Sequence, residues 1–109
     1  MILDEFEEEV ASACSASPIV ISVSLTGSGL TWARLRAYLL DGSFLEAFYN
    51  ETTGKTSYAF IKDGKRIFGA DNTEDWHWHP FEDPEVHILA TSAISFQQFL
   101  NEVEARMKW

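Results

Sequence analysis

The sequence Arg-Leu-Arg-Ala-Tyr-Leu-Leu-Asp-Gly-Ser-Phe-Leu-Glu, residues 34–46, carries the clearest structural signal in the chain. Apolar and polar side chains alternate before Asp41-Gly42, as in a strand that buries one face. An Asp-Gly pair favours a tight type I′ hairpin turn, in which both central residues have positive φ. This stretch therefore predicts an antiparallel hairpin formed by strands at 31–40 and 44–51.

Alternating patterns and turn signals continue on both sides of this hairpin. Downstream, Thr53-Gly54 and Asp63-Gly64 are turn signals that precede strands expected at 56–62 and 66–70. Upstream, a strand is expected at 19–26. Its alternating apolar residues, which should share one face, are Ile19, Ile21, Val23 and Leu25. Short turns between all the strands predict a five-stranded antiparallel β-meander.

An amphipathic helix is expected at each end of the chain. In residues 2–14 the apolar side chains follow a helical period, and they are Leu3, Phe6, Val10 and Cys14. Residues 95–108 begin with Ser95 and Gln98 in the spacing of a capping box, and an apolar stripe follows. We therefore expect one α+β domain, residues 1–109, with both helices packed on one face of the sheet.

Composition narrows the classes of location and partner. The 109 residues carry a formal net charge of −9, whereas nucleic-acid binders usually present a basic patch. The structural interpretation is a solvated acidic surface, and the functional one is a basic partner or a local site that overrides the global charge. The single cysteine, Cys14, excludes an intrachain disulfide and is expected to be buried. The first ten residues contain five acids and no base, unlike a secretory signal, and no apolar run approaches the roughly 18 residues of a membrane span. A cytoplasmic protein that does not enter a membrane is expected.

Residues 71–87 break the strand pattern and are expected to form an ordered loop. The loop holds all three histidines of the chain, six acids and no Lys or Arg. Histidine exchanges protons near neutral pH. One interpretation is metal-free acid/base cleavage of a phosphodiester, in which His77, His79 and His87 transfer protons and Asp71 orients one of them.

The phosphate of such a substrate requires a cation. Arg34 and Arg36 are two residues apart, on one face of an expected strand, and are the candidates for binding it. The structural interpretation of these arginines is cross-strand pairing with Glu46 or Glu51.

The same loop is also consistent with a divalent metal ion. In an extended segment His77 and His79 project to the same side, and His87 or Asp71 could complete a three-ligand site. A purely structural role is a further interpretation, in which the histidines stack on neighbouring tryptophans and bond to backbone.

A non-catalytic interaction module belongs to a different class of function. The sheet face or the aromatic loop would then dock a protein partner through large aromatic side chains. The candidate anchors are Trp32, Tyr38, Trp76 and Trp78. An open edge strand would also allow a homodimer.

An ordered set of short motifs runs from residue 31 to residue 88. It comprises the hairpin at 34–46, a strand with Tyr58 and Phe60, the turn Asp63-Gly64, the segment 67–72 that ends in Asp-Asn, and then His77, His79, Pro84 and His87. This ordered set, about half of the chain, resembles the TumE-like toxins of bacterial and archaeal toxin–antitoxin pairs.

The resemblance implies a toxin component that is masked by a helix-turn-helix antitoxin. By extrapolation, the resemblance also suggests a metal-independent, ribonuclease-type activity on RNA at the histidine-rich loop. Where the family usually has an arginine two positions before its Asp-Asn pair, this chain has Gly69. A degenerate family member, or the non-catalytic module described above, is therefore the alternative.

Overall fold

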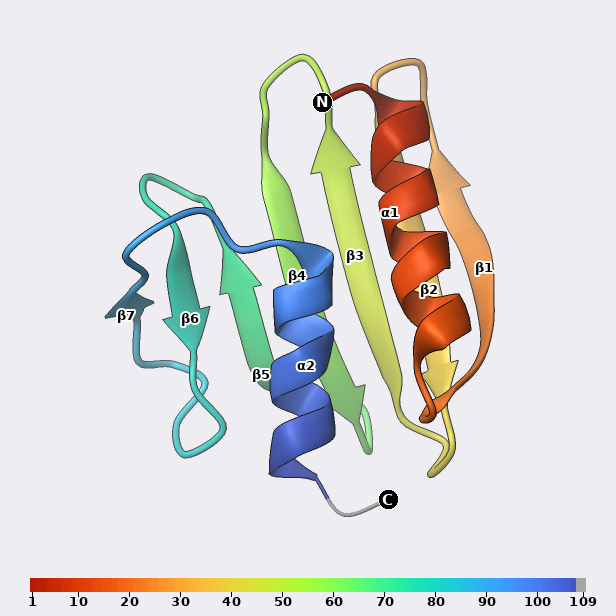
Figure 1. Ribbon diagram of the computed structural model, residues 1–109. Coiled ribbons are helices and arrows are strands. Elements are labelled where there is room, and N and C mark those ends of the chain that lie inside the picture. The colour runs from red at the N-terminus through yellow and green to blue at the C-terminus, as the bar shows by residue number, and fades with distance from the viewer. Residues whose placement is uncertain (108–109) are drawn as a thin grey trace.

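The computed structural model describes residues 1–107, and a seven-stranded antiparallel sheet runs through it with its strands in chain order. The strands are β1 (Val20–Ser28), β2 (Trp32–Leu39), β3 (Phe44–Asn50), β4 (Thr56–Lys62), β5 (Lys65–Asp71), β6 (His77–His79) and β7 (Ile88–Leu89). Two helices, α1 (Leu3–Ala16) and α2 (Phe96–Arg106), lie on the same face of this sheet (Figure 1). The α+β class and the antiparallel sheet are confirmed.

The expected count of five strands is wrong, because β6 lies within the expected loop at 71–87 and β7 directly follows that loop. Residues 77–79 pair with β5 on one side and with residues 88–89 on the other. A strand of three residues is too short for its alternation to be recognised in a sequence. The capping box that opens α2 is confirmed, with Gln98 N–H donating to Ser95 Oγ. Residue 108, the expected end of this helix, lies outside the described residues.

The hairpin turns differ from one another in a way that the Asp-Gly pairs did not predict. Asp63 and Gly64 both have positive φ, 52° and 75°, as a type I′ turn requires. At the first hairpin only Gly42 has positive φ, so the expected type I′ turn there is wrong. Asp41 instead accepts hydrogen bonds from the backbone and side chain of Ser43, which supports a longer connection.

Strand β1 departs from simple alternation. Its register with β2 shifts between Val20 and Ser22, so Ile21 is the extra residue of a bulge. Ile21 is therefore 64% exposed instead of sharing the face on which Ile19 is buried. Leu25 pairs with a core residue but lies on the edge strand and is 54% exposed. The expectation that all four alternating apolar residues share one face is therefore wrong at Ile21.

The core lies between the two helices and the sheet. From α1 it takes Phe6, Val10, Ala13 and Cys14, and from α2 it takes Phe96, Phe99, Leu100 and Val103. The sheet contributes the residues that alternate toward the helices, among them Phe60 and Phe68.

None of the helices in the described part of the chain is long and apolar enough to cross a membrane. The opposite face of the sheet carries no helix of this structure (Figure 1).

Replacing Phe99 by alanine should lower the free energy of unfolding by about 3–5 kcal/mol, because the side chain is fully buried and leaves a cavity. Urea denaturation of the purified protein measures this change. Leu30→Ala is the matched control, since Leu30 is 97% exposed and its loss should leave stability unchanged. Equal effects of the two substitutions would contradict the described core.

Cys14 should be unreactive in the folded protein. Burial raises the pKa of its thiol to about 11, so little thiolate forms at neutral pH. Titration with a chromogenic thiol reagent at pH 7 should detect no fast-reacting group until denaturant is added. Stoichiometric labelling of the native protein within minutes would show that α1 does not bury this thiol against the sheet as described.

Candidate functional site

The pairing of β5 with β6 places the site on the face of the sheet that lacks helices. Asp71 is opposite His77, and Gly69 is opposite His79. The residue between the two histidines, Trp78, points the other way and stacks on Phe68 and Phe99 in the core. Strand alternation therefore brings the imidazoles and the carboxylate together on one side.

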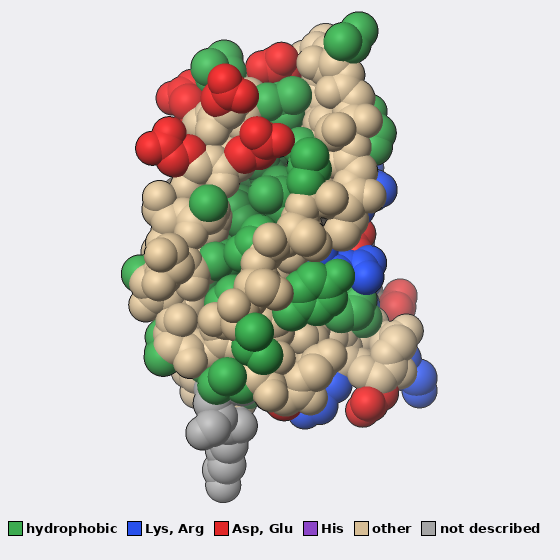
Figure 2. All heavy atoms as spheres, turned by 90° about the vertical axis from the view of Figure 1, so that its right-hand side faces the viewer, with side chains coloured by type: hydrophobic (Ala, Val, Ile, Leu, Met, Phe, Trp, Pro, Cys, Tyr) green, Lys and Arg blue, Asp and Glu red, His purple; other side chains and the backbone are tan. Residues whose placement is uncertain are grey.

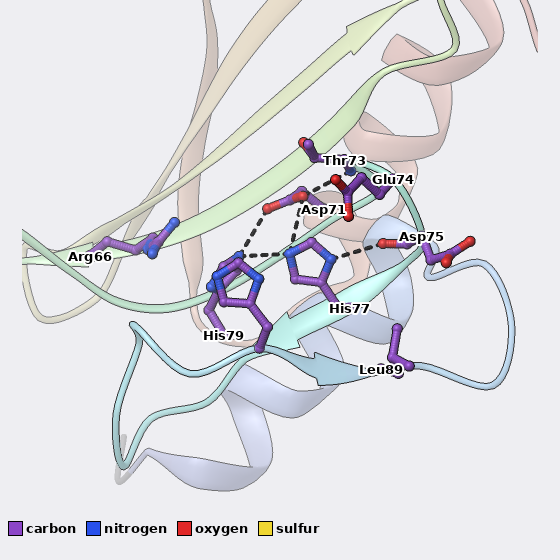
Figure 3. Close-up of a pocket in the computed structure, with 9 residues that line it drawn as sticks. Arg66, Asp71, Thr73, Glu74, Asp75, His77, His79 and Leu89 are labelled. Atoms are coloured by element: carbon purple, nitrogen blue, oxygen red, sulfur yellow. Dashed lines mark hydrogen bonds and ion pairs between the residues drawn. The ribbon is translucent and has the colours of Figure 1, made fainter.

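Four polar atoms of three side chains converge here (Figure 3). His79 Nε2 lies 2.9 Å from Asp71 Oδ2, and His77 Nε2 lies 3.3 Å from Asp71 Oδ1. The two Nε2 atoms are 3.1 Å apart. His77 and His79 are only 6% and 4% exposed, so solvent has little access to these contacts.

The outer ring nitrogens identify the tautomers of both histidines. His77 Nδ1 is 2.8 Å from the carbonyl oxygen of Asp75, and His79 Nδ1 is 3.0 Å from that of Pro84. A carbonyl oxygen only accepts, so each Nδ1 carries the proton and donates. In the neutral rings both Nε2 atoms are then lone-pair acceptors that face each other and a carboxylate. A cation at this centre, either a proton or a metal ion, is needed to hold them together.

His87 completes the cluster from the segment that precedes β7. Its ring is parallel to that of His77, with centroids 4.6 Å apart and 9° between the planes. It meets the ring of His79 edge-on, also at 4.6 Å. Nitrogen atoms of the three histidines lie within 4.8 Å of one another, although His87 itself is exposed. The structure thus brings together the four residues that the sequence singled out, and we call Asp71, His77, His79 and His87 the His–Asp cluster.

Asp71 is held in its ionised form. Partial burial alone would raise the pKa of this carboxyl group. A larger opposite effect comes from the backbone N–H of Thr73, the hydrogen bond with His79 and the nearby His77 ring, all of which lower the pKa. The net effect is a pKa below the ordinary value for aspartate. The cluster therefore contains a negative charge close to two lone pairs.

A pocket of about 570 Å³ opens over the His–Asp cluster. It is lined by one positively charged residue, Arg66, which the sequence analysis did not identify as a site residue. Arg66 donates from Nη2 to the carbonyl oxygen of Pro84, at 3.1 Å. A Cβ at Gly69 would lie 3.3 Å from Arg66 Cδ, so glycine leaves room for this arginine. A register shift at Ile67 places Arg66 on the site face, and no turn residue signals that bulge.

Arg34 and Arg36 lie on the same face but are not brought to the cluster. Both pair with Glu46, at 3.2 Å and 3.0 Å, which is the cross-strand interpretation of these residues. Arg34, Phe48, Ser57 and Asp71 form one row of paired residues across the sheet. Three strand spacings of about 4.8 Å separate Arg34 from Asp71 along this row, roughly 14 Å.

Comparisons with protein-family models, with curated proteins and with solved structures find no match for this chain.

In chelator-treated protein His77 and His79 should both be Nδ1–H tautomers when neutral. Their carbonyl partners require this, whereas histidine in an unfolded chain favours the other tautomer. Long-range ¹H–¹⁵N correlation spectra of the imidazole rings distinguish the two forms. Spectra of the urea-unfolded protein are the control, and a protonated Nε2 on both neutral rings of the native protein would contradict the hydrogen bonds described here.

Proposed function

We propose that this protein is the toxin component of a TumE-like toxin–antitoxin pair and that it cleaves phosphodiesters of RNA at the His–Asp cluster. One observation carries the proposal. Three histidines and a carboxylate, separated by up to 16 positions in the sequence, converge at one pocket that also holds an arginine. Buried polar groups that face one another across a pocket are typical of a reactive site.

Phosphodiester cleavage needs groups that move protons and a cation that balances charge on the phosphate. The cluster provides the first requirement, and in the metal-independent form expected from the sequence its histidines carry the protons. Arg66 provides the second, because its guanidinium lines the same pocket. Arg66 thus takes the phosphate-binding role at the cluster that was expected of Arg34 and Arg36.

The rest of the sheet face suits a single-stranded nucleic acid. A second hollow, of about 210 Å³, is lined by Arg34 with its partner Glu46 and by Phe48, Lys55 and Ser57, and Ser57 pairs directly with Asp71. The Arg34 guanidinium lies 5.4 Å from the centre of the Phe48 ring. Aromatic rings and cations on an open sheet bind splayed bases and the backbone of single strands. A strand of RNA crossing the sheet from the cluster would meet these residues.

The acidic charge of the chain is not spread evenly. Figure 2 shows acidic side chains gathered over α1, which carries Asp4, Glu5, Glu7, Glu8 and Glu9. This surface belongs to the helix layer, on the other side of the sheet from the His–Asp cluster. Part of the acidic charge is therefore on α1, while Glu74 and Asp75 line the pocket beside Arg66. A basic, DNA-binding antitoxin is the partner that this acidic helix would attract.

The protein-interaction module remains the second candidate, and one observation favours it. Edge strand β1 presents exposed Ile21 and Leu25, and exposed Leu30 follows it. The tryptophans of the aromatic loop are less suited to docking a partner, because Trp76 stacks on Tyr58 and Trp78 stacks on Phe68.

His79→Ala should lower the rate of cleavage of an end-labelled single-stranded RNA by about 100-fold or more, because it removes the central imidazole of the cluster. Arg66→Ala should also lower the rate. Gln97→Ala, on the exposed face of α2, is the control that keeps full activity. The same three variants should rank identically in a growth-arrest assay after induced expression.

The native protein must first cleave RNA for this proposal to stand. Native protein that is folded but neither cleaves RNA nor arrests growth would remove the nuclease function and leave the interaction module. Wild-type activity in a folded His79→Ala variant would remove the cluster from the reaction.

A further inference from the structure

The centre of the His–Asp cluster has the dimensions of a metal site. A tetrahedral ion bound at 2.0–2.1 Å separates its ligand atoms by roughly 3.3 Å. Here the two Nε2 atoms are 3.1 Å apart, His79 Nε2 is 2.9 Å from Asp71 Oδ2, and His77 Nε2 is 3.3 Å from Asp71 Oδ1. The three side chains that carry these atoms come from the paired strands β5 and β6.

The hydrogen bonds that orient these ligand side chains also match those of a metal site. Histidines that bind metals through Nε2 usually donate their Nδ1–H to a carbonyl or carboxylate, which fixes the ring. His77 and His79 both do so, to the carbonyl oxygens of Asp75 and Pro84. The carboxylate is fixed in the same way, since the N–H of Thr73 donates to Asp71 Oδ1 at 3.0 Å.

A metal ion satisfies this centre better than a proton does. One proton on an Nε2 atom donates mainly along one direction, whereas three acceptors surround this point. A divalent ion accepts electron pairs from all three at once. The carboxylates of Glu74 and Asp75 also line the pocket and add to its attraction for a cation.

We propose that Asp71, His77 and His79 bind one divalent transition-metal ion, zinc by preference, and that His87 is its fourth, exchangeable ligand. Two or three imidazoles with one carboxylate suit zinc, whereas magnesium and calcium prefer oxygen ligands throughout. His87 is exposed and its ring is stacked on His77, so it reaches the ion by a ring movement and can give up its position.

This metal site does not depend on the proposed function, because only the donor geometry supports it. If the protein also cleaves RNA, the ion would activate a bound water and polarise the phosphate. The histidines would then act as ligands instead of proton carriers. That outcome would replace the metal-independent mechanism expected from the sequence.

Metal content and affinity test the proposal. Protein purified without chelators or an affinity tag that binds metal should contain one zinc ion per chain by elemental analysis. After chelator treatment and dialysis, calorimetric titration with Zn²⁺ should show one site. Addition of Co²⁺ should produce the visible absorption of a tetrahedral nitrogen and oxygen site.

The variants separate the ligands from one another. His77→Gln and His79→Gln should each abolish binding of Zn²⁺, while His87→Ala should weaken it and leave one site. Gln97→Ala is the control with native affinity. Circular dichroism checks that each variant is folded, and the wild-type measurements decide the question by themselves if a buried variant fails to fold.

Two results would overturn the metal site: wild-type protein that binds neither Zn²⁺ nor Co²⁺, or a folded His77→Gln, His79→Gln double variant that binds Zn²⁺ as tightly as the wild type. The RNA assay repeated with and without chelator separates the two proposals. Cleavage by metal-free protein would contradict the metal site as part of the reaction and support the nuclease. One bound zinc with no cleavage would support the metal site and contradict the nuclease.

Discussion

The hydrogen-bonded register between β5 and β6 is the constraint on which the site depends. It places Asp71 opposite His77 and sends Trp78 into the core, where its ring stacks on Phe68 with centroids 5.5 Å apart. A slip of one residue would exchange the two faces of β6. An imidazole would then enter the apolar layer beneath α2, and an indole would enter the pocket. The aromatic packing on one side of the sheet therefore fixes the polar geometry on the other.

The two faces of the sheet serve different purposes. One face is covered by α1 and α2 (Figure 1) and contains the apolar core. The strand registers place the His–Asp cluster and, farther along, Arg34 and Arg36 on the other face. Acidic side chains gather on α1, in the helix layer (Figure 2). The pocket over the cluster is acidic as well, because Glu74 and Asp75 line it beside Arg66.

Local signals in the sequence were enough for β2 to β5 and both helices, because alternation, turn glycines and a capping box act over a few residues. Strand β6 was not predictable, since three residues show no usable period and its histidines are polar although buried. The members of the cluster were recognised as residue types, but their meeting was not, because it requires residues 80–87 to fold back so that Pro84 O accepts from His79 and Arg66. The position of Arg66 was equally hidden, since a bulge at Ile67 sets its direction.

Because the strands follow one another in chain order, all four residues of the cluster lie within a stretch of 17, from Asp71 to His87. The helix that completes the core beneath them comes later, with Phe99 beneath the ring of Trp78. During synthesis the hairpin that bears the cluster thus leaves the ribosome before the layer that holds its register. A nascent or prematurely terminated chain has the reactive side chains without the support that orients them. The geometry of the His–Asp cluster is therefore expected to be complete only when α2 has docked on the sheet.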